Sequence, residues 1–392
     1  MNKSISIFSQ LLQSIDKNAF QGMVRKTGSE KGAKGFTSWD HLVSMLFCQI
    51  GGANSLREIS YGLASIEGKV KHLGVTKVPV RSTLSYANAN RPWELFRALF
   101  MNQLEFCQRA MNGSAKHRFK FKNKLYSLDA SIIELAVRMY DWAKYKTTKG
   151  AVKLHLLLDH DGYLPVFMDI TKGNTHEINV ARTLELPKGS IVAMDMGYND
   201  YSLYNDWTEK GVYFVTRLKG NANLDSIQSL EYSGENVLGD ELVEFSNQES
   251  FNKCPQRLRK VTVHDPDMDR SFVFLTNNTR LSAETIGAIY KDRWNIEAFF
   301  KTIKQSFKIK TFVGTSENAV LIQIWTALIS LLLLKYLAFK AKAGWSLSNL
   351  IAVLRFNLTS YIDLMRLIDQ DFKNFIKSLE YQQLSLFGNA IP

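Results

Sequence analysis

Three acidic residues far apart in the sequence have the types and settings needed for metal-dependent chemistry. Asp129 ends the strand-like run YSLDAS, and Asp195 follows the short apolar run IVAM. Functional carboxylates of an α/β sheet collect at strand ends. Glu297 is the one acid on the polar side of a helical stretch, IYKDRWNIEAFFKTIKQ, at residues 289–305. Either aspartate alone reads as a turn or cap residue, so the hypothesis depends on the three together.

Three carboxylates at one point repel one another, and divalent cations remove that cost. Hard ions such as Mg²⁺ or Mn²⁺ prefer oxygen ligands and keep positions open for water and phosphate. Two such ions about 4 Å apart activate a water or hydroxyl and stabilise the leaving oxygen of a phosphodiester. We therefore expect Asp129, Asp195 and Glu297 to be catalytic residues that bind two Mg²⁺ or Mn²⁺ ions, with no small-molecule cofactor.

The stretch at 289–305 is predicted to be one amphipathic helix. At about 100° per residue, its apolar side can pack on a sheet, and its other side is cationic and aromatic. Most such faces are simply solvated, with Glu297 and Lys301 as an i,i+4 ion pair. Aromatic residues beside cations instead suit base stacking and phosphate contact. We expect DNA contacts from Tyr290, Arg293, Trp294, Lys301 and Lys304.

The composition of the 392-residue chain favours a polyanionic partner. Its formal net charge is +12 and its pI is about 9.4. A basic folded chain suggests nucleic acid or an anionic membrane surface. Three widely spaced cysteines predict neither a disulfide framework nor a metal site, and the first 20 residues do not resemble a signal peptide. These features predict a cytoplasmic protein.

The elements that must position the acids predict an α/β fold with flanking helical parts. Residues 1–115 read as a helical domain, either a helix-turn-helix DNA reader or a plain bundle. Strands and helices alternate over 120–340, with a polar, β-rich insertion at 221–280. A helical segment follows at 341–392. The apolar run at 319–339 is predicted to be a buried core helix rather than a membrane span.

These residues also resemble a known family. Tyr290-x2-Arg293-x3-Glu297-x6-Lys304 matches the Tyr-Arg-Glu-Lys signature of bacterial insertion-sequence transposases of the DDE class, in the fourth insertion-sequence family. Asp129 in LDAS and Asp195 in DMGY resemble that family's two aspartates. The resemblance implies a ribonuclease-H-like core in which the three acids hold the metal ions. It also implies a β-rich insertion between the second aspartate and the glutamate.

The same resemblance implies a reaction and partners. Members hydrolyse DNA at the ends of the element, and the freed 3′-hydroxyl attacks target DNA, typically after a hairpin at the element end. The expected partner is double-stranded DNA, with a homodimer to pair two ends and no membrane. An aromatic side chain would stabilise a flipped base, and Trp294 is a candidate, although packing would explain it equally.

Three other functions stay open from the sequence. The chain could be a catalytically silent DNA-binding protein of this fold, or a ribonuclease-H-like nuclease without strand transfer. A membrane-associated protein would need residues 319–339 in lipid. His155 and His176 are set aside as structural, and Arg217 and Lys219 as surface charges, although each could line the site.

Overall fold

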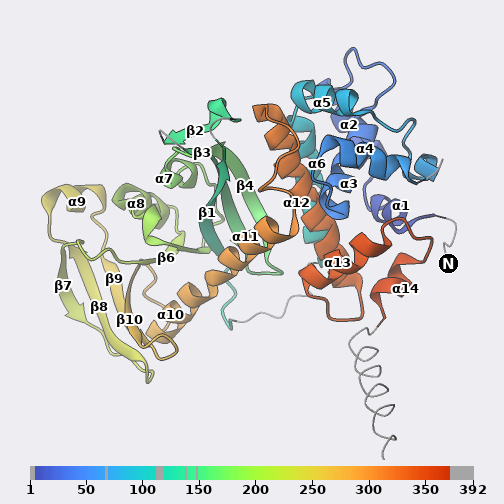
Figure 1. The fold of residues 1–392 in the computed structure, drawn as a ribbon. Helices are drawn as coiled ribbons and strands as arrows, with labels where there is room; N and C mark the ends of the chain where they lie inside the picture. Colours follow the sequence, from blue (N-terminus) through green and yellow to red (C-terminus); the bar gives the residue numbers. More distant parts are fainter. Residues whose placement is uncertain (1–4, 67–68, 112–118, 137–138, 147–148, 371–392) are drawn as a thin grey trace, which may run out of the picture. The chain divides into compact units, whose positions relative to one another are not determined.

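The computed structural model describes residues 5–66, 69–111, 119–136, 139–146 and 149–370 (Figure 1). The chain divides into two compact units, the first made of residues 1–107 and 302–392 and the second of residues 108–301. This grouping differs from the expected domains, because residues 302–340 were expected in the α/β part. The reason is the long apolar helix in this segment, which needs the N-terminal helices to bury it.

The first unit is helical, as predicted. A capping box begins its third helix. Oγ1 of Thr37 accepts a hydrogen bond from Asp40 N, and the Asp40 carboxylate accepts one from Thr37 N. The described helices that lie wholly in this unit are α1 (Ile7–Leu12), α2 (Lys17–Thr27), α3 (Ser38–Gly51), α4 (Leu56–Ala64), α5 (Arg81–Asn90), α12 (Glu317–Lys340), α13 (Leu347–Asn357) and α14 (Leu364–Ile368). Helix α6 (Glu94–Met111) leads from this unit into the second.

Helix α12 is the centre of the first unit. It is long and apolar enough to cross a membrane, but 83% of its most apolar window is buried inside the protein. Its buried Gln323 has partners on both sides of the amide: it accepts from Val313 N and donates to Thr311 O. Trp325 stacks on Trp93 at 6.4 Å between ring centroids. These contacts fit the predicted core helix.

The second unit is built on one ten-stranded sheet (Figure 1). Its strand order is β2-β3-β1-β5-β6-β10-β9-β8-β7, and β4 pairs with β3. The strands of the first half are β1 (Leu125–Leu135), β2 (Lys144–Lys146), β3 (Lys149–Asp159), β4 (Leu164–Lys172), β5 (Ile191–Met194) and β6 (Tyr213–Arg217). Strand β1 is antiparallel to β3 and parallel to β5, which is parallel to β6. The predicted mixed α/β sheet is therefore present.

The predicted β-rich segment at 221–280 extends this sheet. It contains β7 (Leu224–Ser229), β8 (Val237–Phe245), α9 (Gln248–Lys253), β9 (Leu258–Asp265) and β10 (Arg270–Thr276). Strand β10 is antiparallel to β6, so the insertion continues the core strands edge to edge. The remaining helices of the unit are α7 (Glu177–Ala181), α8 (Tyr201–Glu209) and α10 (Ala283–Asp292), followed by the start of α11 (Trp294–Ser306).

Helices cover both faces of the central strands. Alternate residues of a strand point to opposite faces. Tyr126 and Leu128 of β1 belong to the hydrophobic cluster that includes residues of α8. Leu125 of β1 and Ile191 of β5 belong to the cluster that includes residues of α10. Positions 127, 129, 193 and 195 continue that second face, so the α10 side of the sheet is where functional residues on β1 and after β5 should gather.

The prediction of a single helix over 289–305 is wrong. Helix α10 ends at Asp292, and α11 begins at Trp294. At Arg293 the backbone N–H is shared between the carbonyls of Ile289 and Tyr290, which tightens the turn locally. This interruption falls at Arg293, about one helical turn before the expected catalytic glutamate.

Candidate active site

The two aspartates come from neighbouring central strands of the sheet: Asp129 lies within β1, and Asp195 directly follows β5. Strands β1 and β5 are parallel, with Leu128 paired to Met194. Continuing this register by one residue sets Asp129 beside Asp195, on the face covered by α10. Asp195 caps a short 3₁₀ turn, and its Oδ1 accepts from Gly197 N at 2.8 Å. The strand-end placement predicted from the sequence is therefore present for Asp195 but wrong for Asp129, because β1 continues to Leu135 in its pairing with β3.

Arg293 links Asp129 to Glu297. Its Nη1 lies 3.3 Å from Oδ2 of Asp129, and its Nη2 donates to Oε1 of Glu297 at 2.9 Å. The Arg293 side chain is only 7% exposed, compared with 42% for Glu297. A buried guanidinium needs carboxylate partners to offset its desolvation. Arg293 thus supplies a cation to two of the acids that the sequence predicted to be catalytic.

Burial is the main influence on the ionisation of Asp129, and its neighbours modify it. Burial raises the pKa of Asp129 to about 6, against the opposing effects of the Arg293 guanidinium and the Ala130 N–H. The carboxylates of Asp195 and Glu297 raise this pKa further. All three acids thus act on one another within the second unit, even with Arg293 present.

The donor set fits a divalent cation, although the side chains are not gathered for one. Among the described residues, no three His, Cys, Asp or Glu side chains are close enough to hold a metal ion. Arg293 instead supplies the positive charge between Asp129 and Glu297. Carboxylate oxygens are the ligands that Mg²⁺ and Mn²⁺ prefer. Within the described part of the chain, the buried hydroxyl of Tyr198 has no hydrogen-bond partner. Burial raises its pKa, and the nearby carboxylates of Asp129 and Asp195 raise it further.

The residues predicted to contact DNA fall into two groups. Tyr290 and Arg293 are buried, at 9% and 6% exposure, so they do not form the exposed stripe that one continuous helix would give. Tyr290 packs on Phe274 in the core under α10. Trp294 is 52% exposed, and Lys301 is also exposed. Lys304 lies on the part of α11 that belongs to the first unit.

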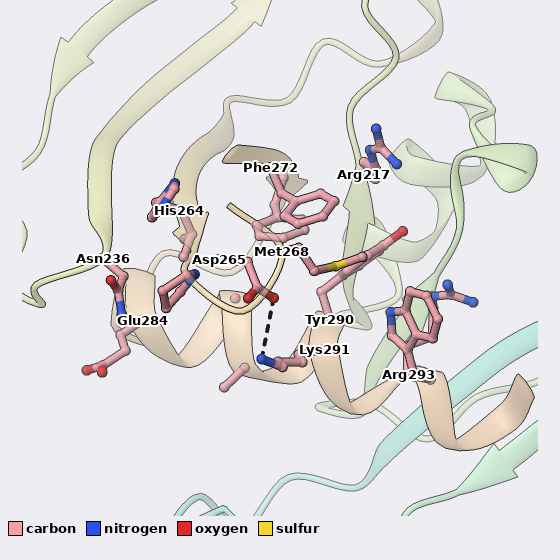
Figure 2. Close-up of a pocket in the computed structure, with 16 residues that line it drawn as sticks. Arg217, Asn236, His264, Asp265, Met268, Phe272, Glu284, Tyr290, Lys291 and Arg293 are labelled. Atoms are coloured by element: carbon pink, nitrogen blue, oxygen red, sulfur yellow. Dashed lines mark ion pairs between the residues drawn. The ribbon is translucent and has the colours of Figure 1, made fainter. Parts of the chain in front are cut away.

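A cavity of about 260 Å³ opens beside Arg293 and Trp294 (Figure 2). Its floor is apolar and aromatic, formed by Phe272, Phe274 and Tyr290 together with Val263 and Met268. Cationic side chains also line it, and the guanidinium of Arg217 lies 5.3 Å from the Phe272 ring. Arg217 was set aside as a surface charge, and the sequence analysis missed Phe272 and Met268. Their lining role depends on β9 and β10 lying next to α10, which no local pattern reveals.

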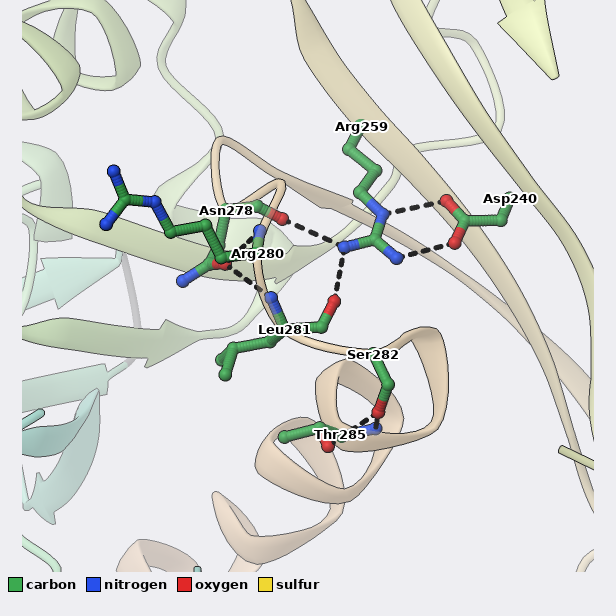
Figure 3. Close-up of polar contacts among 7 residues, drawn as sticks. All are labelled: Asp240, Arg259, Asn278, Arg280, Leu281, Ser282 and Thr285. Atoms are coloured by element: carbon green, nitrogen blue, oxygen red, sulfur yellow. Dashed lines mark hydrogen bonds and ion pairs between the residues drawn. The ribbon is translucent and has the colours of Figure 1, made fainter. Parts of the chain in front are cut away.

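A buried ion pair fixes the start of α10 against the insertion (Figure 3). Arg259 of β9 donates to both carboxylate oxygens of Asp240 of β8, from Nε at 2.7 Å and from Nη2 at 2.5 Å. Its Nη1 donates to the carbonyls of Asn278 and Leu281, just before α10. Ser282 then caps α10 by accepting from Thr285 N. The β-rich insertion therefore helps to orient the helix that leads to Arg293.

The histidines on β3 and before α7 do not join the acids. His155 is paired in register with Ala130, so it lies on the opposite face of the sheet from Asp129. Its Nε2 bonds to Oγ1 of Thr171 at 2.8 Å. His176 precedes α7 and makes no side-chain cap bond to it. The sequence interpretation of both as structural residues remains the better one.

Comparison with known proteins identifies the domains by sequence. Residues 120–333, more than half of the chain, match the Transposase DDE domain. Residues 3–76 match a domain of unknown function, DUF4372. The first match implies a ribonuclease-H-like core, which confirms the fold expected for the sheet of the second unit.

Curated relatives carry transposase names. A protein of Sinorhizobium fredii named as transposase y4zB is 32% identical over 268 residues, covering 66% of this chain and 72% of its own. One of Geobacillus stearothermophilus, named for insertion sequence element IS5377, is 28% identical, covering 70% and 72%. One of Synechocystis, named for element IS4SA, is 24% identical, covering 67% and 73%.

Among solved structures, a piggyBac transposase synaptic complex with hairpin DNA aligns with 98% of this chain and 84% of its own. The TM-score is 0.44 and the identity 11%, which is too low to establish a common fold.

Proposed function

Because the chain belongs to the DDE transposase family, we propose that Asp129, Asp195 and Glu297 are its catalytic acids. In this proposal they cut DNA at the ends of an insertion sequence and direct the freed end into target DNA. The observation that carries it is that the buried Arg293 bridges Asp129 and Glu297, while Asp195 follows the parallel strand next to Asp129 and acts on its carboxylate. Acids with a purely structural role would each be expected to pair with a cation of their own nearby, rather than share one arginine across two elements.

Divalent metal ions are a general requirement of this family, and we propose that two Mg²⁺ or Mn²⁺ ions bind here. Asp129 would hold both with Asp195, and Glu297 would complete the site. When bound, such ions activate the attacking oxygen and stabilise the leaving oxygen of a phosphodiester. The raised pKa of Asp129 supports this assignment, because it comes first from burial and then from the carboxylates of Asp195 and Glu297, and a bound cation would offset both.

Arg293 has two tasks in this proposal. Without DNA it neutralises Asp129 and Glu297. Its guanidinium must leave these oxygens for them to become metal ligands, and a phosphate oxygen is a suitable new partner for it. Lys301 and Lys304, further along α11, would hold the backbone of the same DNA.

The cavity beside Trp294 supports a hairpin route of excision. A strand that folds into a hairpin at the element end has to expose a base, and an aromatic pocket lowers the cost of unstacking it. Trp294 is half exposed at the rim, while Phe272 and Tyr290 line the interior. The Arg217 and Arg293 side chains would meet the flanking phosphates. Trp294 is thus proposed to stack on a base rather than to pack in the core.

The wider setting follows from the chemistry. Pairing two element ends requires two active sites, so we propose a homodimer on double-stranded DNA. A cytoplasmic enzyme without a membrane span agrees with the burial of α12. The net charge of +12 favours binding to the DNA backbone.

Cleavage of end-containing DNA with Mg²⁺ tests the catalytic assignment. Asp129→Asn, Asp195→Asn and Glu297→Gln should each lower the single-turnover rate by about 10³-fold or more, since each removes a ligand charge. Glu249→Gln is the matched control, because Glu249 pairs only with Lys253 on the exposed surface of α9. Wild-type cleavage by any of the three acid variants would show that the acids are not the catalytic set.

Two product analyses separate the alternatives. A nuclease without strand transfer would cut the ends but give no product joined to target DNA. A silent DNA-binding protein would retain the ends in a gel-shift assay and cut nothing with Mg²⁺ or Mn²⁺.

A further inference from the structure

Ser127, His160 and Asp292 form a hydrogen-bonded chain inside the second unit that the proposed reaction does not use. Oγ of Ser127 lies 2.7 Å from Nε2 of His160. Nδ1 of His160 lies 2.5 Å from Oδ2 of Asp292. The three groups follow one another in the same order as in a serine hydrolase.

Burial excludes a nucleophilic role for this serine. Ser127 is completely buried in β1, and the His160 and Asp292 side chains are 7% and 1% exposed. A nucleophile must reach the carbon or phosphorus that it attacks. The chain of bonds must therefore act within the protein rather than on a substrate.

This chain and the further bonds of its members together connect four elements. Tyr163, in the turn between β3 and β4, has its Oη 3.2 Å from Oδ2 of Asp292. Asn295, in the first turn of α11, donates from Nδ2 to Oδ1 of Asp292 at 3.1 Å and to its carbonyl at 2.8 Å. The backbone N–H of His160 donates to Leu125 O at the start of β1. The result is a buried junction of β1, the β3–β4 turn, α10 and α11.

The members of this junction adjoin the catalytic candidates in sequence. Ser127 precedes Asp129 by two residues and lies on the same face of β1. Asp292 directly precedes Arg293, and Glu297 follows just over one helical turn later. Fully satisfied buried polar networks fix the relative positions of the elements that they join.

We propose that His160 and Asp292 are positioning residues for the site formed by Asp129, Asp195 and Glu297, and this inference rests on the proposed function. They hold the strand that carries Asp129 at a set distance from the helix junction that carries Arg293 and Glu297. Metal and catalytic sites need their ligands held within about 0.5 Å, which local packing of separate elements rarely ensures. The hydrogen bonds of the buried junction would hold these elements at fixed positions relative to one another.

The test uses full-length Asp292→Asn and His160→Gln, with Ser127→Ala as the mildest change. Mn²⁺ affinity without DNA, measured by electron paramagnetic resonance, and the single-turnover cleavage rate should each fall about 10–100-fold. The dissociation constant for end DNA should stay within about twofold, because no DNA-contacting group is removed. The double variant His160→Gln/Asp292→Asn should be no worse than the poorer single variant, since the pair acts as one unit.

Lys153→Met is the matched control. Lys153 is buried in β3 and donates to Thr175 O and Glu177, both at 2.7 Å. Its loss should lower the melting temperature but leave the Mn²⁺ affinity of the folded protein unchanged. An equal loss of Mn²⁺ affinity in this control would overturn the proposal, because general destabilisation would then explain the effect.

Wild-type Mn²⁺ affinity in folded Asp292→Asn and Ser127→Ala would also overturn it. If Asp292→Asn does not fold, Ser127→Ala decides by the same readouts. Failure of the proposed function would look different: the wild-type protein would then cut no DNA, while the Mn²⁺ affinities would still report on positioning.

Discussion

The role of Arg293 in the structure differs most from the role that the sequence predicted for it. The sequence predicted it as an exposed DNA contact, yet it is buried and binds Asp129 and Glu297. A single arginine thus stabilises the acids when no other cation is near. Nuclease activity in the absence of the correct DNA would harm the host of the element, and under the proposed function this contact would keep the acids inactive until DNA binds.

Replacing Arg293 with Met should therefore tighten the binding of Mn²⁺ to the protein without DNA. Met keeps most of the side-chain volume but removes the competing charge, and we expect an increase in affinity of about tenfold or more. Electron paramagnetic resonance of free Mn²⁺ measures it. Lys301→Met, an exposed cation on the same helix, is the control and should leave the affinity unchanged. Unchanged or weaker binding in Arg293→Met would show that the arginine does not compete with the metal.

The sequence predicted the position of Asp195 better than that of Asp129. Asp195 follows β5, as its apolar run indicated, whereas β1 continues past Asp129 to Leu135, because its pairing with β3 extends beyond the apolar run. Arg293 is polar on any helical wheel, and its burial beside Glu297 is matched by a second carboxylate, Asp129, that comes from a distant strand. His160 was missed because its partners Ser127 and Asp292 come from two other elements. Only tertiary structure brings such residues together.

Helix α10 connects the β-rich insertion to the acid site. Its start is held by the buried pair of Asp240 and Arg259, which are 2% and 5% exposed (Figure 3). Its end carries Asp292 and leads to Arg293. The insertion was predicted from its alternating pattern, but its function as a support for α10 was not, because a pattern does not say which carbonyls a buried arginine will bind.

Asp240→Asn should destabilise the protein by about 3–5 kcal/mol, because it leaves the buried Arg259 without a counter-charge. The double variant Asp240→Leu/Arg259→Met should recover only part of this loss, since the carbonyls of Asn278 and Leu281 lose their donor. Urea unfolding measures both, and amide hydrogen exchange in α10 should quicken in Asp240→Asn. A loss below about 1 kcal/mol would contradict the importance of the pair.

Each of the two units contains a buried histidine that must stay neutral. Burial, with the nearby Arg91, lowers the pKa of His41 in the first unit to about 3, despite a bond to Asn88. Burial, with the nearby Lys153, lowers the pKa of His155 in the second unit to about 4, despite Glu177. Both imidazoles would take up a proton near pH 6.5 once unfolded. Acid therefore favours unfolding of both units.

The free energy of unfolding should thus be highest above pH 6.5 and fall as the pH drops from about 6.5 towards 4. The unfolded state binds the extra protons in this window, and each histidine contributes a slope of up to about 1.4 kcal/mol per pH unit. Urea unfolding at pH 7.5, 6.0 and 5.0 measures the slope. His41→Gln and His155→Gln should each flatten it, and an unchanged slope in both variants would exclude these histidines as the cause.

The first unit is made from both ends of the chain, and this arrangement sets an order of events during synthesis. Residues 1–107 leave the ribosome early, but α12, which fills their core, is made only after the whole second unit. Domains fold as units while the chain emerges. The unit that holds Asp129, Asp195 and Arg293 can therefore fold while the helical unit still lacks its central helix. A ribosome that stopped before residue 317 would release a folded sheet unit beside helices with an exposed apolar surface, a target for chaperones and proteases.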